Sequence, residues 1–188
     1  RLTVVPMRGW QRGMTWRNTG LRWIPTSPNI PGPNSPIYYA ATGILGSLDG
    51  VDIGIGTARP FEYAGGKGID PGQFAADMTR MRIPGVRFSP YVSSRKPGFA
   101  GVALGIDPHG STDLMALAVI LCSEVVRRSN GHPLRATSGD TLTLFHKVWG
   151  SESLWNALKS RRPAGQVIAG FQSYARGFAE SRQGFLLY

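Results

Sequence analysis

Residues 85–128 read GVRFSPYVSSRKPGFAGVALGIDPHGSTDLMALAVILCSEVVRR, and this stretch decides the fold class. Apolar residues alternate with polar or small ones in Gly85–Tyr91 and again in Phe99–Asp107, which predicts two strands joined by a basic turn. Ser111 is suited to cap a helix that continues to about Arg128. Together these elements predict an α+β fold, with a mixed or antiparallel sheet flanked by helices.

Three further helices are predicted outside this stretch. Pro71 suits the first position of a helix over Pro71–Arg82, and the side chains that share one face of it are Phe74, Met78 and Met81. A second helix is predicted to begin at Ser151, and its predicted buried residues are Leu154, Trp155 and Leu158. The last helix runs from Ala164 to about Arg182, and we expect its apolar stripe to face the core. This stripe consists of Val167, Ile168, Phe171, Tyr174, Ala175 and Phe178.

Other segments have weaker patterns. Ile37–Leu48 is compatible with a helix that contains two glycines or with a buried strand, because its apolar run fits both periods. Val51–Gly56 alternates apolar residues with small or acidic ones. The segment from Gly131 to Gly139 is predicted to be a loop, and Leu2–Val5 is predicted to be a short strand that ends at Pro6.

The N-terminal region is rich in tryptophan, arginine and proline. Three tryptophans and four arginines lie within Arg8–Trp23, and five prolines follow between residues 25 and 36. Such a segment, without helical or strand periodicity but rich in aromatic residues, is typical of a long ordered loop with a function. We therefore expect residues 1–36 to form a linker strand and a cleft-lining loop, and residues 37–188 to form a single α+β domain.

Composition excludes several classes of protein. The chain has 188 residues, of which 41% are hydrophobic, so it is not intrinsically disordered. The longest apolar run, Leu114–Cys122, has nine residues, whereas a membrane-spanning helix needs about 20. Cys122 lies inside this run and is interpreted as a core residue rather than a nucleophile. A single cysteine forms no internal disulfide, so it does not reveal the redox compartment.

The chain carries a net charge of +10, which favours anionic partners. Its basic residues are dispersed, however, and no nucleic-acid-binding motif accompanies them, so a solvated basic surface is the preferred interpretation and nucleic-acid binding is not expected. The residues that bind zinc most often lie far apart in the sequence; they are His109, His132, His146 and Cys122. Neither a metal nor a cofactor is therefore expected.

Few residues suggest catalysis. Hydrolysis of a glycosidic bond needs two neighbouring carboxyl groups, and the chain has 11 acidic residues. Glu62 is the acid expected in a cleft, although an ion pair with Arg59 is a structural alternative. The remaining candidates are interpreted as helix-surface charges (Glu124, Glu152 and Glu180) or as residues at helix starts and turns (Asp113 and Asp140). The Gly54-x-Gly56 pair lacks the further residues of a phosphate-binding loop.

Five segments of the chain carry recognisable motifs: Val4–Trp10, Trp23–Pro31, Gly56–Glu62, Gly85–Phe88 and the C-terminal part from Gly170 to Tyr188. In this order they resemble the NamZ-type exo-β-N-acetylmuramidases. The resemblance implies a bacterial enzyme, periplasmic or extracellular, that removes N-acetylmuramic acid from the non-reducing end of peptidoglycan fragments. It also implies that this chain corresponds to the second half of such an enzyme, and that the partner half is N-terminal and Rossmann-like.

The same resemblance indicates which residues face the substrate. Trp23, Asn29, Arg59 and Glu62 match the family's cleft, so we expect these four to bind substrate, with anionic peptidoglycan fragments as ligands. Many family members have Glu-Gly-Arg-Gly-Thr where this chain has Ile53-Gly-Ile-Gly-Thr57. Isoleucine neither ionises nor donates a proton, so no catalytic residue is assigned, and this chain is not expected to be catalytically self-sufficient.

A second hypothesis follows from the same substitutions. A domain of this family that has lost its catalytic groups can serve as a non-catalytic structural or docking subunit of a larger assembly, possibly one at a membrane. In that case the partner is another protein complex rather than the N-terminal half of a muramidase. Both hypotheses predict a chain without a transmembrane segment of its own.

Overall fold

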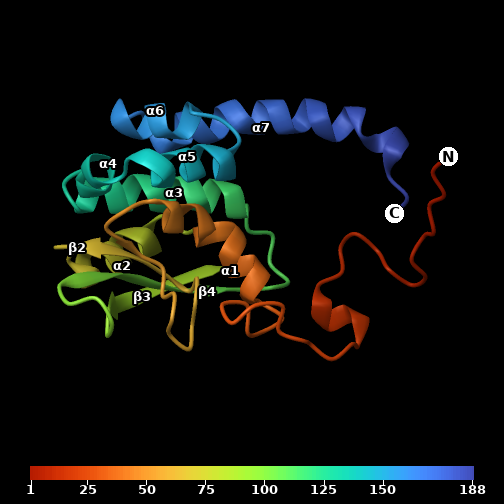
Figure 1. The fold of residues 1–188 in the computed structure, drawn as a ribbon, viewed down its shortest axis with the longest axis horizontal. Coiled ribbons are helices and arrows are strands. Elements are labelled where there is room, and N and C mark those ends of the chain that lie inside the picture. Colours follow the sequence, from red (N-terminus) through yellow and green to blue (C-terminus); the bar gives the residue numbers. More distant parts are fainter.

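A computed structural model describes all residues 1–188. A four-stranded sheet lies beneath a layer of helices, and the long C-terminal helix extends beyond both (Figure 1). The strands are β1 (Val51–Asp52), β2 (Tyr63–Lys67), β3 (Val86–Val92) and β4 (Phe99–Ile106). They are ordered β1-β2-β4-β3, and every neighbouring pair is antiparallel. The predicted α+β class and the two predicted strands are confirmed.

Strand β2 was not predicted, because its sequence, Tyr-Ala-Gly-Gly-Lys, contains two glycines and one strongly strand-forming residue. It forms because β4 pairs with it from Tyr63↔Ala103 to Lys67↔Phe99. The Val51–Gly56 alternation produces a strand of only two residues, since the chain turns away after Asp52.

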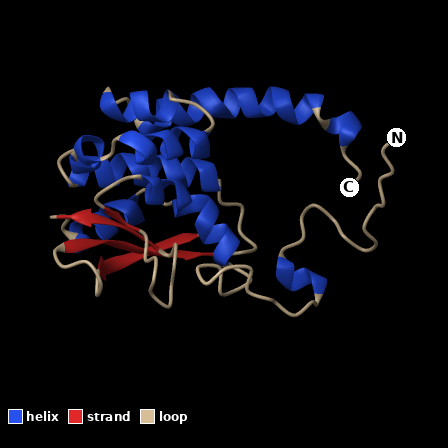
Figure 2. Cartoon of the chain, viewed as in Figure 1, coloured by secondary structure: helices blue, strands red, loops and turns tan.

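The two faces of the sheet differ in chemistry. Side chains alternate between the faces along a strand, and paired residues share a face. On one face Val102, Leu104 and Ile106 are buried in the core beneath the helices. The helical layer lies on this side of the sheet, and loops extend below the strands (Figure 2). The opposite face is called the open face below, and its residues are Asp52, Tyr63, Gly65, Lys67, Arg87, Ser89, Tyr91, Phe99, Gly101, Ala103 and Gly105.

Helices α2 (Pro71–Arg80) and α3 (Leu114–Arg128) cover the apolar face. Each begins with an aspartate cap: Asp70 accepts a hydrogen bond from the backbone of Gln73, and Asp113 accepts one from Ala116. Asp113, not the predicted Ser111, is therefore the cap of α3. In α2, Phe74 and Met78 are fully buried, whereas Met81 lies beyond the helix end and is 44% exposed.

The chain between α3 and the C-terminal helix is more helical than predicted. Gly131–Gly139 is not a loop throughout, because α4 (His132–Ala136) occupies most of it. Helix α5 (Gly139–Trp149), also unpredicted, follows; Phe145 packs from it into the core with an exposed fraction of 0%. Helix α6 (Ser153–Lys159) begins two residues after the predicted Ser151. Its predicted core residues, Leu154, Trp155 and Leu158, are all buried.

Ile37–Leu48 is helical, which resolves the alternative left by its sequence. Helix α1 (Ser35–Thr42) continues into the 3₁₀ helix η2 (Gly43–Ser47). Before α1, residues 1–34 contain only the short 3₁₀ helix η1 (Trp16–Thr19). Leu2–Val5 is not a strand, because no neighbouring strand is available to satisfy its backbone hydrogen bonds.

Helix α7 (Ala164–Ser181) is followed by the 3₁₀ helix η3 (Gln183–Phe185). The predicted core stripe holds only for its first half, where Val167, Ile168 and Phe171 pack against the core. Beyond that, the helix projects past the domain (Figure 1). Tyr174 is therefore 78% exposed and Phe178 is 54% exposed, and the prediction that they are core residues is wrong.

Candidate functional site

The open face of the sheet is bridged by a hydrogen bond between its two outermost strands. Asp52 on β1, Gly65 on β2, Gly101 on β4 and Tyr91 on β3 form one transverse row. The Tyr91 hydroxyl donates to Oδ2 of Asp52 over 2.8 Å. The two residues between them are glycines, so no side chain on the row's middle strands obstructs this contact.

Asp52 is buried, with only 4% of its surface exposed. Burial by itself raises the pKa of this carboxyl, but hydrogen bonds from Ser93, from the Gly54 backbone and from Tyr91 outweigh it and hold the pKa of Asp52 below its usual value. The Gly54 nitrogen lies 3.1 Å from Oδ1, and the Lys96 ammonium group lies 3.9 Å from the same oxygen. Asp52 is therefore an ionised group that organises the surrounding loops.

Two tyrosines stack above this row. The rings of Tyr63 and Tyr91 have centroids 3.9 Å apart and an interplanar angle of 9°. Burial, together with the hydrogen bond to the Asp52 carboxylate, raises the pKa of Tyr91 to about 12. The phenol therefore stays protonated at neutral pH and remains a donor. The pair presents an aromatic surface of the kind that packs against flat apolar groups.

The loop from Ile53 to Glu62 carries the predicted site residues Arg59 and Glu62. Gly54 has a φ of +80°, and a Cβ there would lie 2.8 Å from the Arg59 carbonyl oxygen, so the tight turn requires glycine. The loop closes where the Phe61 backbone donates to the Ile53 carbonyl over 2.7 Å. Buried Thr42 on α1 then donates to the Phe61 carbonyl over 2.7 Å and fixes the end of the loop.

Arg59 and Glu62 contact one another directly. Nε and Nη2 of Arg59 lie 2.6 and 2.5 Å from Oε2 of Glu62, and the guanidinium group lies 5.5 Å from the centre of the Tyr63 ring. The ion pair proposed from the sequence is thus present. The Arg59 side chain is 52% exposed, so the guanidinium remains accessible beside the stacked tyrosines.

The two isoleucines of this loop have different environments. Ile53 is buried in the core with an exposed fraction of 6%, whereas Ile55 is 43% exposed at the turn. Beside Ile55, Arg95 from the β3–β4 loop donates to the Gly56 carbonyl over 2.6 Å. A cationic group from another loop thus lies at this turn, and no carboxylate is provided by either isoleucine position.

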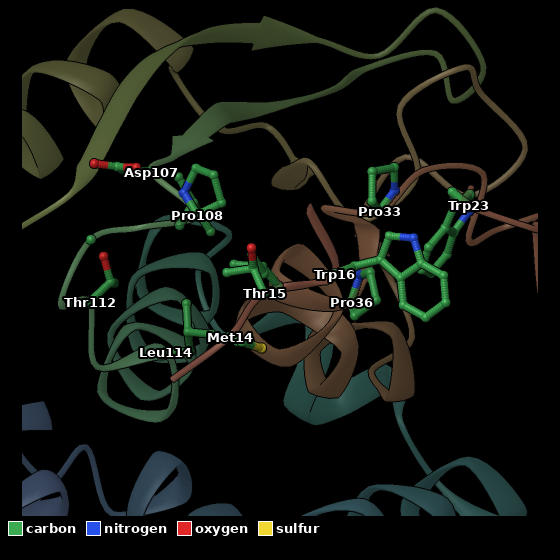
Figure 3. A pocket seen from close by; sticks show the side chains of 13 residues that line it. Met14, Thr15, Trp16, Trp23, Pro33, Pro36, Asp107, Pro108, Thr112 and Leu114 are labelled. Carbon is green, nitrogen blue, oxygen red and sulfur yellow. The ribbon is translucent and has the colours of Figure 1, made fainter. Parts of the chain in front are cut away.

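Trp23 lies in a different place, in a cavity of about 370 Å³ between the N-terminal region and the β4–α3 connection (Figure 3). It meets Trp16 edge to face with ring centroids 5.3 Å apart. Across the cavity lie Asp107, Pro108 and Thr112. The Nε1 atom of Trp23 is buried and has no hydrogen-bond partner. Asn29 is half-buried, and its backbone nitrogen donates to Ser27 Oγ over 3.2 Å.

The structure brings two of the four predicted site residues into contact. Arg59 and Glu62 are in contact, whereas no hydrogen bond or ion pair joins Trp23 or Asn29 to them. The Trp23 cavity, which Ile106 at the end of β4 lines, and the Arg59–Glu62 pair, which precedes β2, lie at the same end of these two antiparallel strands. Tyr38 on α1 contacts the cavity end of β4, since its hydroxyl accepts a hydrogen bond from the Ile106 backbone.

Sequence reasoning missed Asp52, Tyr63, Tyr91 and Lys96. The signal for Asp52 was an acidic residue within an apolar strand, where a buried charge needs partners. The tyrosines gave no such signal, because they are far apart in sequence and β2 was not predicted. In chemical terms the face offers a guanidinium, carboxylates, phenol groups and an aromatic surface. No three of the His, Cys, Asp and Glu side chains come together as a metal site.

The chain is an α+β domain in which helices cover one face of a four-stranded antiparallel sheet, and a solved structure has the same fold. A crystal structure described as a DUF1343 family protein, from Bacteroides fragilis, matches 96% of this chain with a TM-score of 0.85 and 27% sequence identity. This chain covers 49% of that one. The likeness therefore extends over the whole domain and over about half of the larger protein.

The sequence also matches a named family. Residues 37–188 match the family described as "Exo-beta-N-acetylmuramidase NamZ, C-terminal", and residues 1–34 match its N-terminal counterpart. The chain belongs to the NamZ family, as the resemblance of its motifs indicated. A relative from Bacillus subtilis, "Peptidoglycan beta-N-acetylmuramidase NamZ", is 25% identical over 197 residues. The alignment covers 100% of this chain and 45% of that relative, so the chain spans about half the relative's length.

Proposed function

We propose that this chain is the C-terminal, substrate-contacting domain of a peptidoglycan exo-β-N-acetylmuramidase, and that it is not catalytically self-sufficient. The observation that carries the proposal is the cluster on the open face. There the accessible Arg59 lies beside the stacked pair Tyr63 and Tyr91. Aromatic surfaces bind the flat faces of sugars, and a guanidinium group binds the carboxylates of lactyl or peptide groups.

Trp23 and Asn29 are proposed to extend this site toward the cavity at the end of β4. The buried Nε1–H of Trp23 has no acceptor in this structure. An unpaired donor costs free energy, and a hydroxyl or carbonyl group of a bound sugar would satisfy it. In this proposal Arg59 binds the anionic substituent, and Trp23 contacts a sugar further along the ligand.

The catalytic acid and its partner are proposed to come from an N-terminal, Rossmann-like half. One feature of the chain supports such a neighbour. The outer half of α7 has no core to cover its exposed Tyr174 and Phe178, and exposed apolar patches of this kind mark interaction surfaces.

The proposed substrate places the protein at the cell wall, in the periplasm or outside the cell. None of the helices is long and apolar enough to cross a membrane. The net charge of +10 favours association with anionic peptidoglycan fragments.

The first test is binding of a muramic-acid-containing muropeptide to the chain, measured by calorimetry. Arg59→Ala should weaken binding about tenfold or more, because a hydrogen bond to a charged group contributes roughly 1.5–3 kcal/mol. Arg80→Ala is the matched control: Arg80 also forms an exposed i,i+3 ion pair, with Asp77, on a different part of the surface. Equal binding by wild type and Arg59→Ala, with a lower Tm for the variant, would show that Arg59 is only structural.

The second test addresses self-sufficiency. The chain alone should release no N-acetylmuramic acid from muropeptides, whereas a mixture with the N-terminal half of a NamZ relative should restore release. Tyr174→Ser with Phe178→Ser should abolish that restoration without lowering the Tm, since both side chains are exposed. Release by the chain alone would contradict the proposal.

The substituted loop favours a second candidate function, a non-catalytic docking or structural subunit. Ile53 and Ile55 stand where many relatives of this family carry a glutamate and an arginine, and Ile53 is part of the core. A docking subunit would bind its protein partner through α7 but would show no saturable muropeptide binding. The calorimetric measurement above therefore separates the two functions.

A further inference from the structure

A second cavity, of about 740 Å³, opens at the C-terminal end of α3. It lies between the α3–α4 turn, α4, and the connection from α6 to α7. Helix α3 has 15 residues and is therefore about 22 Å long. The cavity lies at the far end of this helix from Leu114, which lines the Trp23 cavity.

The lining is strongly basic. Its charged side chains are Glu124, Arg127, Arg135, Lys159, Arg161 and Arg162, five cations against one carboxylate. That carboxylate already forms ion pairs, because Oε2 of Glu124 lies 2.6 Å from Nη2 of Arg127 and 2.9 Å from Nε of Arg128. The remaining four cations form no ion pair within the chain. The local excess of positive charge is therefore uncompensated.

The backbone adds to this excess. Helix α7 begins at the cavity with Pro163 as its N-cap, and no side chain caps its first turn. The free N–H groups and the dipole of a helix N-terminus attract negative charge. The C-terminal end of α3 has the opposite polarity, but the Arg127 and Arg128 side chains lie in its last turn and offset it.

Arg161 has an unusual backbone. Its φ of +53° lies in the left-handed region, which favours glycine. The turn is the end of α6, where the Arg162 nitrogen donates to the Ala157 carbonyl over 2.9 Å. This turn places Arg161 and Arg162 at the lining of the cavity, directly before α7.

We propose that this cavity binds a phosphorylated ligand, a phosphate ester or a diphosphate. A carboxylate carries one charge, whereas a phosphate group carries up to two and offers three acceptor oxygens. Arginine pairs with phosphate through two parallel hydrogen bonds. Several unpaired cations around one cavity therefore match a ligand with clustered charge better than they match a single carboxylate. This site is independent of muropeptide binding at the open face.

The test is calorimetric titration of the chain with inorganic pyrophosphate at fixed ionic strength. We expect saturable binding of one pyrophosphate per chain. Arg161→Gly with Arg162→Gln should weaken it at least tenfold. The fold should be retained and the Tm unchanged or raised, because glycine suits the conformation of residue 161. The matched control, Arg82→Gly with Arg176→Gln, makes the same two changes at exposed arginines that do not line the cavity, and Arg82 also has a positive φ, of +50°.

Absence of saturable binding, or equal weakening by the test pair and the control pair, would overturn the site and leave only general charge attraction. Vesicles with and without phosphatidylglycerol then identify the source of the phosphate. Competition between the anionic vesicles and pyrophosphate assigns a lipid headgroup, and lack of competition assigns a soluble phosphorylated compound. Arg59→Ala should bind pyrophosphate as wild type does, whether or not it has lost muropeptide binding. The phosphate-site proposal and the muropeptide-site proposal are therefore tested separately.

Discussion

The Tyr91 hydroxyl on one edge strand donates a 2.8 Å hydrogen bond to the buried Asp52 carboxylate on the other edge strand. The contact crosses the full width of the sheet and holds together the loops that carry Arg59 and Lys96. It therefore links the stability of the open face with the geometry of the proposed binding site.

Tyr91→Phe should destabilise the protein by about 1–3 kcal/mol, because a buried carboxylate loses a donor. The raised pKa of Tyr91 adds a second signature. Its protonated form contributes stability below the ordinary tyrosine pKa of 10.0, and this contribution is lost as the pH rises toward about 12. Denaturant unfolding measures the first effect, and ultraviolet titration of tyrosine the second.

Tyr174→Phe is the control for both measurements, because Tyr174 is 78% exposed and forms no hydrogen bond through its hydroxyl. It should leave the stability unchanged and the late-titrating tyrosine in place. If Tyr91→Phe behaves like Tyr174→Phe, the bridge contributes nothing to the fold.

The lowered pKa of Asp52 predicts how the free energy of unfolding changes at acidic pH. Because its pKa is lowered on folding, the ionised carboxylate contributes stability above the ordinary aspartate pKa of 3.8. This contribution disappears as the pH falls through the lower folded value. Asp52→Asn should therefore be less stable at neutral pH and should lose less stability than wild type below about pH 4. Parallel stability curves for the two proteins from neutral pH to acid would contradict this role.

Gly101 should tolerate no side chain. A Cβ at this position would lie 2.1 Å from the Ala64 carbonyl oxygen, and that atom belongs to the paired strand. Gly101→Ala should thus destabilise the chain by roughly 1–3 kcal/mol, since backbone must move. Thermal unfolding is the measurement.

Gly170 supplies the matched control, because a Cβ there meets no atom within 4 Å in the middle of α7. Gly170→Ala should stabilise the helix by about 0.5–1 kcal/mol. A Gly101→Ala protein as stable as wild type would mean that β2 and β4 separate at little cost.

Cys122 should be unreactive in the native protein. Its side chain is fully buried, and burial raises the pKa of the thiol, so almost no thiolate is present or accessible. A thiol reagent should modify it only as fast as the protein unfolds, and denaturant should accelerate the reaction. Modification of the native protein at the rate of a small free thiol would show that the α3 region opens readily.

The elements predicted from sequence were those with strong local patterns. The alternation in Phe99–Asp107 and the apolar run of α3 correspond to β4 and to the central helix, and Cys122 is a core residue as expected. Pro71 and Leu154 likewise lie in predicted helices. These patterns can be detected in a short window of sequence, because side chains on one face repeat every 3.6 residues in a helix and every two residues in a strand.

The errors have a common cause in long-range contacts. Strand β2 exists because β4 pairs with it, and α5 is held by packing of Phe145 into the core, neither of which a short window of sequence reveals. The stripe on α7 shows the reverse case. Its pattern is the same at Phe171 and Phe178, but the domain ends between them, so only the first is covered.

The candidate site divides in the same way. By itself the sequence determined the family and the Arg59–Glu62 ion pair, because these depend on residues close together in the chain. Only the tertiary structure decided that Asp52, Tyr63 and Tyr91 join Arg59 on one face, and that Trp23 lies in a separate cavity. The physical reason is that a sheet aligns residues from four strands in rows, and the register of those rows depends on pairing rather than on local sequence.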